Sequence, residues 1–182
     1  MTPLRLILAA GLVSGAFVSA VPAQAEVTQS SAAGFVVTGS ATTTRSAEDV
    51  WYLLVEPAEW WNGEHTWSGD ATNLRLDPEA GGCFCESMPL GGSVEHMRVI
   101  YAAPGEMLRM SGALGPLQGE GLAGTLTVEI STAGSGIEVS WAYVVGGNAR
   151  FPLQEVAGTV DLMLAEQMTR LVSRLENPEL RR

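Results

Sequence analysis

The C-terminal part of the chain carries the pattern that most constrains the fold. Apolar residues recur there at intervals of three and four: Leu153, Val156, Val160, Leu164, Met168, Leu171 and Leu175. This spacing predicts one amphipathic helix over residues 152–176, roughly 36 Å long at 1.5 Å per residue. A helix with a single apolar stripe must bury that stripe, so the preceding chain has to supply a matching apolar surface.

The segments before this helix have the two-residue period of half-buried strands. Residues 125–131 place Leu126, Val128 and Ile130 on one face, and residues 137–145 place every second residue on one face. Other β signals occupy residues 83–88 and 93–101. Short successive strands joined by glycine-rich turns predict an antiparallel meander with one buried face. The expected fold class is therefore α+β, with a curved antiparallel sheet wrapped around the long C-terminal helix.

Nearer the N-terminus, residues 34–45 are rich in β-branched side chains and predict a first strand. Ser46 and Asp49 then form a helix-capping pattern, and Pro57 ends that helix. A second short turn carries Trp60 and Trp61. We therefore expect two short helices after the first strand.

These segments, in this order, resemble the START-like or SRPBCC superfamily, whose helix-grip fold is shared with birch pollen allergen. The resemblance spans residues 35–176 and is nearest to the polyketide cyclase-like branch, which also holds homologues of a heat-shock-protein ATPase activator. The matching pieces are Val50-Trp51, Trp60-Trp61, Gly81-Gly82-x-Phe84, and Leu171 with Leu175.

The resemblance implies a cavity between sheet and helix that holds an apolar or aromatic small molecule. Some relatives are cyclases or dehydratases, others only bind, and one branch docks a chaperone. The family shares no catalytic set, so the resemblance assigns no catalytic residue to this chain. The sequence CFC around Phe84 also departs from the more usual polar or basic residues there.

The ends of the chain predict export. Residues 1–25 have the layout of a cleavable secretory signal, cut before Glu26, with an uncleaved anchor as the alternative. Residues 26–33 are expected to be a flexible lead-in, residues 34–177 the domain, and residues 178–182 a tail. A periplasmic or secreted location follows, with no membrane insertion after cleavage, and it argues against a cytosolic co-chaperone role.

The charge of the chain disfavours polyanionic partners. The net charge is −10, and every basic side chain is arginine. Such a field repels phosphate backbones and anionic lipid, so no nucleic-acid or membrane-surface role is expected. A small neutral or cationic partner is easier to accommodate. The alternative is that the net charge serves only solubility. No cofactor is expected.

The two cysteines, Cys83 and Cys85, raise the question of a disulfide or a metal site. Side chains at i and i+2 of a regular strand lie about 6 to 7 Å apart, beyond the reach of a disulfide. Together with His65 and His96 the cysteines match the count of a tetrahedral zinc set, but the spacing fits no finger or ribbon, so no metal site is expected. The alternative to a disulfide or a metal site is that both cysteines are small buried hydrophobic residues.

A hairpin in which Pro89 pairs with Ser93 divides the side chains into two faces. The inward face would hold Cys83, Cys85, Met97, Val99 and Tyr101, which would then line the cavity. The outward face would hold Phe84, Glu86, His96 and Arg98. A one-residue slip of the register would exchange the partners.

Three residues are candidates for acid–base chemistry: Glu86 with His96, as an orienting carboxylate and a general base, and His65 near the cavity mouth. The alternative for the first two is a solvated ion pair on the outer face. Trp67, Trp141 and Tyr143 are further candidate ligand-binding residues, or they fill space under the helix. The expected function is small-molecule binding by an exported protein, with an enzyme using the same cavity or a protein-interaction module as alternatives.

Overall fold

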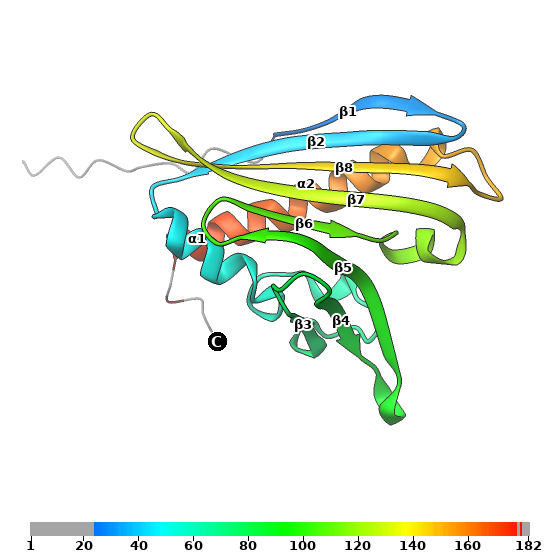
Figure 1. The fold of residues 1–182 in the computed structure, drawn as a ribbon, viewed down its shortest axis with the longest axis horizontal. Helices are drawn as coiled ribbons and strands as arrows, with labels where there is room; N and C mark the ends of the chain where they lie inside the picture. Colours follow the sequence, from blue (N-terminus) through cyan, green and yellow to red (C-terminus); the bar gives the residue numbers. More distant parts are fainter. Residues whose placement is uncertain (1–23, 178, 180–182) are drawn as a thin grey trace, which may run out of the picture.

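An eight-stranded antiparallel sheet curves around one long helix, as the sequence predicted (Figure 1). The computed structural model describes residues 24–177 and residue 179. The strands follow the order β1-β2-β8-β7-β6-β5-β4-β3. Their bounds are β1 (Gln24–Ser31), β2 (Gly34–Thr43), β3 (Leu74–Leu76), β4 (Cys83–Ser87), β5 (Ser93–Ala103), β6 (Met107–Ser111), β7 (Gly121–Ala133) and β8 (Gly136–Asn148). The fold is a helix-grip fold, and most of the predicted signal segment and C-terminal tail lies outside the described residues.

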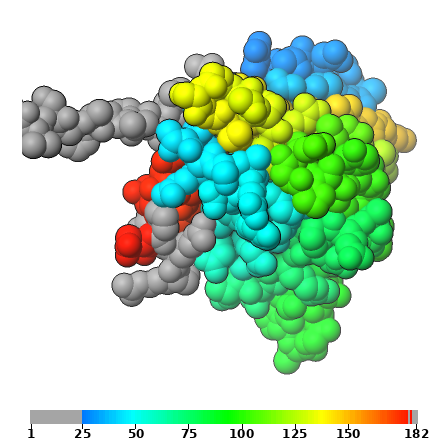
Figure 2. Space-filling model, turned by 60° about the vertical axis from the view of Figure 1, so that its left-hand side comes forward, coloured from blue at the N-terminus to red at the C-terminus, as the bar shows by residue number. Residues whose placement is uncertain are grey.

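The long helix α2 (Gln154–Glu176) packs its stripe against the concave face of the sheet. The middle and C-terminal members of the predicted stripe, Leu164, Met168, Leu171 and Leu175, are buried. Glu176 accepts hydrogen bonds from the side chain of Thr43 and from the backbone of Thr44 at the end of β2. This contact holds the C-terminal turn of the helix beside α1, as the neighbouring red and cyan surfaces show (Figure 2). Among the described residues, no helix is long and apolar enough to cross a membrane.

The predicted flexible lead-in is wrong. Residues 24–31 form strand β1, which pairs with β2 along its length, from Gln24 opposite Ser40 to Ser31 opposite Gly34. Only Ala25 and Val27 pack against the core, and the remaining side chains are polar. Backbone pairing at a sheet edge places this strand, and such pairing leaves little trace in a hydrophobic pattern.

Helix α1 (Ala47–Leu54) begins with the predicted capping box of Ser46 and Asp49. The second expected helix is the 3-10 turn η1 (Pro57–Glu59), and two more such turns follow, η2 (Gly63–His65) and η3 (Ala71–Asn73). Helix α2 holds this connection in place. The backbone N–H of Asn62 donates to the buried Gln167 Oε1 at 2.8 Å, and Arg170 Nε donates to the Trp60 carbonyl at 2.9 Å.

The predicted register of the β4–β5 hairpin is also wrong. Ser87 pairs with Ser93, and the chain turns through residues 88–92, which include the 3-10 turn η4 (Pro89–Gly91). Pro89 has no backbone N–H to donate, so it lies in the turn and does not pair with Ser93. The hairpin projects from the rest of the domain (Figures 1 and 2).

Two bulges in β5 change which side chains face the core. Phe84 pairs with Met97 but Cys85 pairs with Glu95, so His96 is an extra residue on β5. Val99 pairs with Met110 but Tyr101 pairs with Arg109, so Ile100 is a second extra residue. Bulges of this kind bend a strand, as the curve of β5 shows (Figure 1).

As a result, the predicted inner and outer faces are partly exchanged. Phe84, Glu86 and His96 are buried with Met97 and Val99 on the inner side. Tyr101 is instead 48% exposed, with the Arg109 guanidinium 5.8 Å from its ring centroid. Cys83 and Cys85 alternate with the inward side chains and lie on the outer side, across from Arg98 and Glu95.

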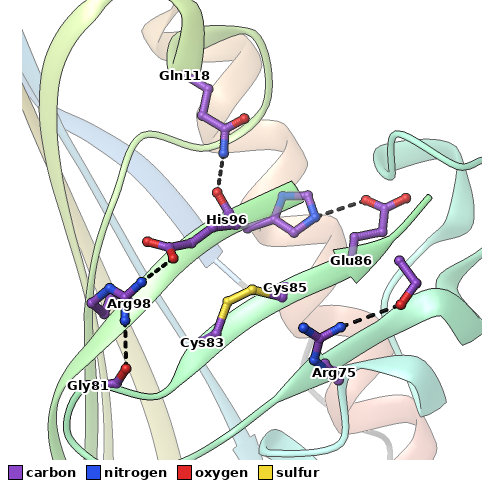
Figure 3. Close-up of a disulfide and its surroundings, with 10 residues drawn as sticks. Arg75, Gly81, Cys83, Cys85, Glu86, His96, Arg98 and Gln118 are labelled. Carbon is purple, nitrogen blue, oxygen red and sulfur yellow. Dashed lines mark hydrogen bonds and ion pairs between the residues drawn. A yellow bond between two sulfur atoms is a disulfide. The ribbon is translucent and has the colours of Figure 1, made fainter. Parts of the chain in front are cut away.

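Cys83 and Cys85 form a disulfide, contrary to the prediction (Figure 3). The prediction assumed a regular extended strand, in which i and i+2 lie too far apart. In the structure the two Cα atoms are 5.3 Å apart, inside the usual range for bridged cysteines. The strand is contracted at the position where β5 carries its extra residue, and the disulfide lies at this contraction.

The close packing of β7 against Tyr143 can be tested at Gly124. A Cβ there would lie 2.2 Å from the Gly112 carbonyl oxygen and 2.9 Å from the Tyr143 hydroxyl. We expect Gly124→Ala to lower the free energy of unfolding by about 2 kcal/mol, because the backbone must move. Gly158→Ala is the matched control, since nothing lies within 4 Å of its Cβ position, and it should raise stability by about 0.5 to 1 kcal/mol in the helix. Urea unfolding measures both, and equal effects would contradict the packing.

Candidate functional site

A cleft of about 650 Å³ lies beside the N-terminal half of α2. Its walls come from three segments: the turn around η2, the loop containing the 3-10 turn η5 (Gly115–Gly119), and α2 itself. The lining residues are Trp61, Glu64, His65, Thr66, Trp67, His96, Leu114, Gly115, Pro116, Leu117, Phe151, Val156, Thr159, Val160, Leu162, Met163 and Glu166. The lining is mainly apolar and aromatic, with a small number of polar groups.

Glu86 and His96 form a buried pair at the inner wall of this cleft. His96 Nε2 lies 2.9 Å from Glu86 Oε2, and the two side chains are 6% and 0% exposed (Figure 3). Glu86 also accepts hydrogen bonds from the backbone N–H groups of Trp67, at 3.0 Å, and Ser68. The pair therefore connects β4, β5 and the loop that carries Trp67.

The environment keeps Glu86 ionised. Burial acts to raise the pKa of its carboxyl, but the hydrogen bonds from Ser68, Trp67 and His96 outweigh burial, so the pKa is lowered. Three donors to one carboxylate supply much of the solvation that water would otherwise give. The alternative of a solvated surface ion pair is excluded by the burial of both side chains.

His96 is held in its neutral form with a defined tautomer. Burial lowers its pKa, and the hydrogen bond and charge of Glu86 only partly offset that effect. An ionised carboxylate can only accept, so Nε2 carries the proton and Nδ1 carries the lone pair. Within the described part of the chain, Nδ1 has no hydrogen-bond partner, and His96 lines the cleft. This arrangement can accept a hydrogen bond or a proton from a bound molecule.

His65 lies at the outer rim of the same cleft. Its Nε2 is 3.1 Å from Glu166 Oε2, and Asn62 Nδ2 donates to Glu166 Oε1 at 2.6 Å. Burial acts to raise the pKa of Glu166, but these partners lower it overall. Both His65 and Glu166 are more than a third exposed, so water screens the pair, which positions the rim without building a buried acid–base site.

Tyr143 shapes the cleft without lining it. Its hydroxyl donates to the Gly112 carbonyl at 3.2 Å and accepts from the Leu114 N–H at 2.9 Å, while burial raises its pKa to about 12. The neutral phenol therefore anchors the loop that supplies Leu114 and Leu117. Trp141 is buried under α2 and borders a different hollow of about 1050 Å³ along β1, β2, β8 and α2.

The structure thus separates the predicted site residues into three groups. His65, Trp67 and His96 meet at the cleft, with Glu86 directly behind His96. Met97, Val99, Trp141 and Tyr143 are core residues, and Cys83, Cys85 and Tyr101 lie on the outer side of the sheet. Sequence reasoning missed Leu114, Leu117, Phe151, Met163 and Glu166. Val156 and Val160 were recognised only as members of the helix stripe.

The four residues that matched a zinc set do not come together. His65 and His96 line the cleft, whereas both cysteine sulfurs are in the disulfide on the other side of β4. In the described part of the chain, the sulfurs and a carboxylate oxygen of Glu95 lie within 4.8 Å of one another. Sulfurs in a disulfide are not thiolate ligands, so this grouping offers a metal little in the oxidised state.

Comparison with known proteins identifies the fold. No family model and no curated protein matches the sequence. Among solved structures, protein MLL2253 from Mesorhizobium loti aligns with a TM-score of 0.56 at 17% identity, over 78% of this chain and 96% of that one. CalU16 from Micromonospora echinospora aligns with a TM-score of 0.52 at 12% identity, over 86% and 88% of the two chains.

DynU16, a protein from the dynemicin biosynthetic locus, aligns with a TM-score of 0.58 at 13% identity. The alignment covers 81% of this chain and 49% of DynU16, so this chain spans about half the length of that protein. At such identities these likenesses define the class of fold alone. They fit the helix-grip architecture described above.

The Glu86–His96 pair predicts how stability depends on pH. The pKa of each group is lower in the folded state than in the unfolded chain, so the unfolded chain binds protons first on acidification. Stability should fall as the pH drops below about 6.5, where unfolded histidine titrates, and fall further below about 4.5 through Glu86. Denaturant unfolding at a series of pH values measures the trend.

Two substitutions assign this dependence. Glu86→Gln should lower the free energy of unfolding at pH 7 by about 3 kcal/mol, because the backbone donors of Trp67 and Ser68 lose an ionised acceptor. It should also remove the part of the pH dependence below about 4.5. Glu106→Gln, on an exposed turn, is the control and should stay within about 0.5 kcal/mol of the parent. The same loss from both variants would contradict the special role of Glu86.

Proposed function

We propose that this protein binds an apolar or aromatic small molecule in the cleft between α2, the η2 turn and the η5 loop. The observation that carries the proposal is the lining: a largely apolar and aromatic wall with a few polar groups around about 650 Å³. Volumes and linings of this kind are typical of small-molecule sites. Trp61, Trp67 and Phe151 supply flat apolar surface for an aromatic ligand.

The polar groups restrict the ligand further. His96 offers an unpartnered acceptor at Nδ1 in the inner wall, so a ligand with a hydroxyl or N–H group at its buried end fits best. Glu64 and Glu166 line the rim, and the chain carries a net charge of −10. Both disfavour an anionic ligand and favour a neutral or cationic one.

We also propose a family and a cellular location for this protein. The helix-grip fold, the order of sequence motifs and the likeness to a protein of the dynemicin locus support membership of the polyketide cyclase-like branch of the SRPBCC superfamily. The signal-like residues 1–25 support export to the periplasm or outside the cell. The Cys83–Cys85 disulfide supports the same location, because disulfides persist in oxidising compartments.

Binding can be measured with the neutral aromatic dye N-phenyl-1-naphthylamine, followed by dye emission and by quenching of the cleft tryptophans. We expect saturable uptake by the full chain. Val160→Phe should weaken the affinity by about tenfold or more, because the added ring fills the space that the dye needs.

Val144→Phe is the matched control for this experiment. Val144 is 49% exposed and is not among the residues that line the cleft, so the same substitution there should leave the affinity unchanged. Uptake that does not saturate would refute the binding proposal. Saturable uptake with equal affinity in both variants would place the dye outside this cleft.

A second candidate function is an enzyme that uses His96 as a general base and Glu86 as its orienting partner. The buried, neutral His96 with its proton on Nε2 and its lone pair toward the cleft favours this candidate. The base-sensitive aromatic probe 5-nitrobenzisoxazole reports proton abstraction in an apolar site by opening to a coloured phenolate.

We expect the protein to accelerate the opening of this probe above buffer, and His96→Gln to abolish the acceleration while dye binding remains. His65→Gln is the control, because His65 is paired with Glu166 at the exposed rim. A rate that is unchanged by His96→Gln would exclude His96 as the base and leave a binding function alone.

A further inference from the structure

The disulfide and the first β5 bulge occupy the same position in the sheet. Between Phe84 and Cys85 the chain advances one residue on β4, while the partners Met97 and Glu95 are two residues apart on β5. The disulfide joins Cys83 to Cys85 across this step and holds their Cα atoms 5.3 Å apart. Two steps of a regular strand cover about 6.6 Å, so the bridge shortens β4 where β5 has its extra residue.

That extra residue is His96, and the bulge is the reason it faces inward. Met97 and Val99 face the core, so regular alternation along β5 would turn Glu95 inward and His96 outward. The bulge inserts His96 on the inner side instead, within 2.9 Å of Glu86, and leaves Glu95 on the outer side beside the cysteines. The placement of the cleft histidine therefore depends on a local irregularity that the disulfide spans.

Chain stability does not account for this disulfide. A disulfide stabilises mainly by closing a loop in the unfolded chain, and the effect decreases as the loop becomes shorter. Cys83 and Cys85 are two residues apart, so the bridge closes almost no loop. They are also the only cysteines of the chain. Because the entropic effect of this bridge is so small, an effect on the local geometry of β4 explains it better.

The surroundings suit reaction with a thiol. Cys83 is partly exposed on the outer side of the sheet, across from Arg98, and Cys85 is buried across from Glu95. Arg98 donates to Glu95 and, at 2.8 Å, to the Gly81 carbonyl (Figure 3). Cys83 is the more exposed of the two cysteines, so an attacking thiolate reaches its sulfur first. Access is from the outer face and does not pass through the cleft.

We propose that Cys83–Cys85 is a thiol–disulfide exchange site for a dithiol reductant, and that its redox state decides whether His96 faces the cleft. The thiolate of the reductant attacks Cys83 Sγ, forming a mixed disulfide and releasing Cys85, which takes up a proton. The second thiol of the reductant then attacks the reductant sulfur that is bonded to Cys83. This step releases Cys83, which takes up a proton. Two electrons and two protons pass to the protein, and the reductant leaves as a disulfide.

The consequence for the cleft follows from strand geometry. In the dithiol form β4 is free to extend to its regular length. The disulfide then no longer maintains the bulge in which His96 is the extra residue of β5. Loss of the bulge turns His96 toward the outer side and breaks its hydrogen bond to Glu86. The same change affects the η5 loop, because Gln118 of that loop donates a hydrogen bond to the Glu95 carbonyl (Figure 3). The position of His96 changes in this way whichever ligand the cleft accepts.

Nitrogen-15 NMR of the two imidazoles tests both steps on the full chain. The chain has only two histidines. His65 is an internal control, because its ring is paired with Glu166 on α2 and, in the described part of the chain, has no hydrogen bond to β4 or β5. After treatment with dithiothreitol under native conditions, alkylation and mass spectrometry should show two modified thiols. The His96 ring resonances should move to those of an imidazole without a carboxylate partner, and those of His65 should not move.

A double variant, Cys83→Ser with Cys85→Ser, should reproduce the reduced spectrum without reductant, with circular dichroism to verify the fold. A disulfide that resists dithiothreitol until the protein unfolds would overturn the exchange site. Reduction that leaves His96 unchanged, or that shifts both histidines alike, would overturn the coupling. Loss of the fold on reduction would overturn both, since the dithiol form must be a folded state.

Discussion

Burial of the α2 stripe is the constraint on which the rest of the structure depends. A helix of this length exposes too much apolar surface to be stable alone, and only a curved sheet presents a concave face long enough to cover it. The strands cover the middle and C-terminal part of the stripe, around Leu164, Leu171 and Leu175. Toward its start, at Val156 and Val160, the stripe is only partly buried and is faced by loops. The cleft lies at this transition from sheet to loops.

This constraint also explains which parts could be predicted from the sequence. Periods of 3.6 and 2 predicted α2, β7 and β8, because in those elements burial of one face decides the pattern. The same reasoning failed at β4 and β5, where the extra residues His96 and Ile100 each change which side chains of the paired strands share a face. A bulge has no signature in a two-residue period, so a single missed bulge exchanged the predicted faces. The disulfide was missed for the same reason, since it depends on the contraction at that position.

The site residues also divide into those that could be predicted from the sequence and those that could not. His65, Trp67 and His96 were named from residue type, and they meet because a loop, a strand and a helix converge. Leu114 and Leu117 were not predicted, because their position depends on a hydrogen bond from the Leu114 N–H to Tyr143, which is 29 residues away. No local pattern specifies such a bond. Long-range polar contacts of this kind help to shape the cleft, and they lie beyond single-sequence reasoning.

The electrostatic balance at Glu86 shows why the cleft can hold a buried neutral histidine without an ion pair. Two buried charges would each lose their hydration, and their attraction repays that loss only when the geometry is very good. Here a single charge is buried, and backbone N–H groups of Trp67 and Ser68 solvate it. His96 can then stay neutral and keep its lone pair free. Because β4 carries Glu86 on its inner side and the preceding residue, Cys85, on its outer side, a change in the bridge acts directly on this balance.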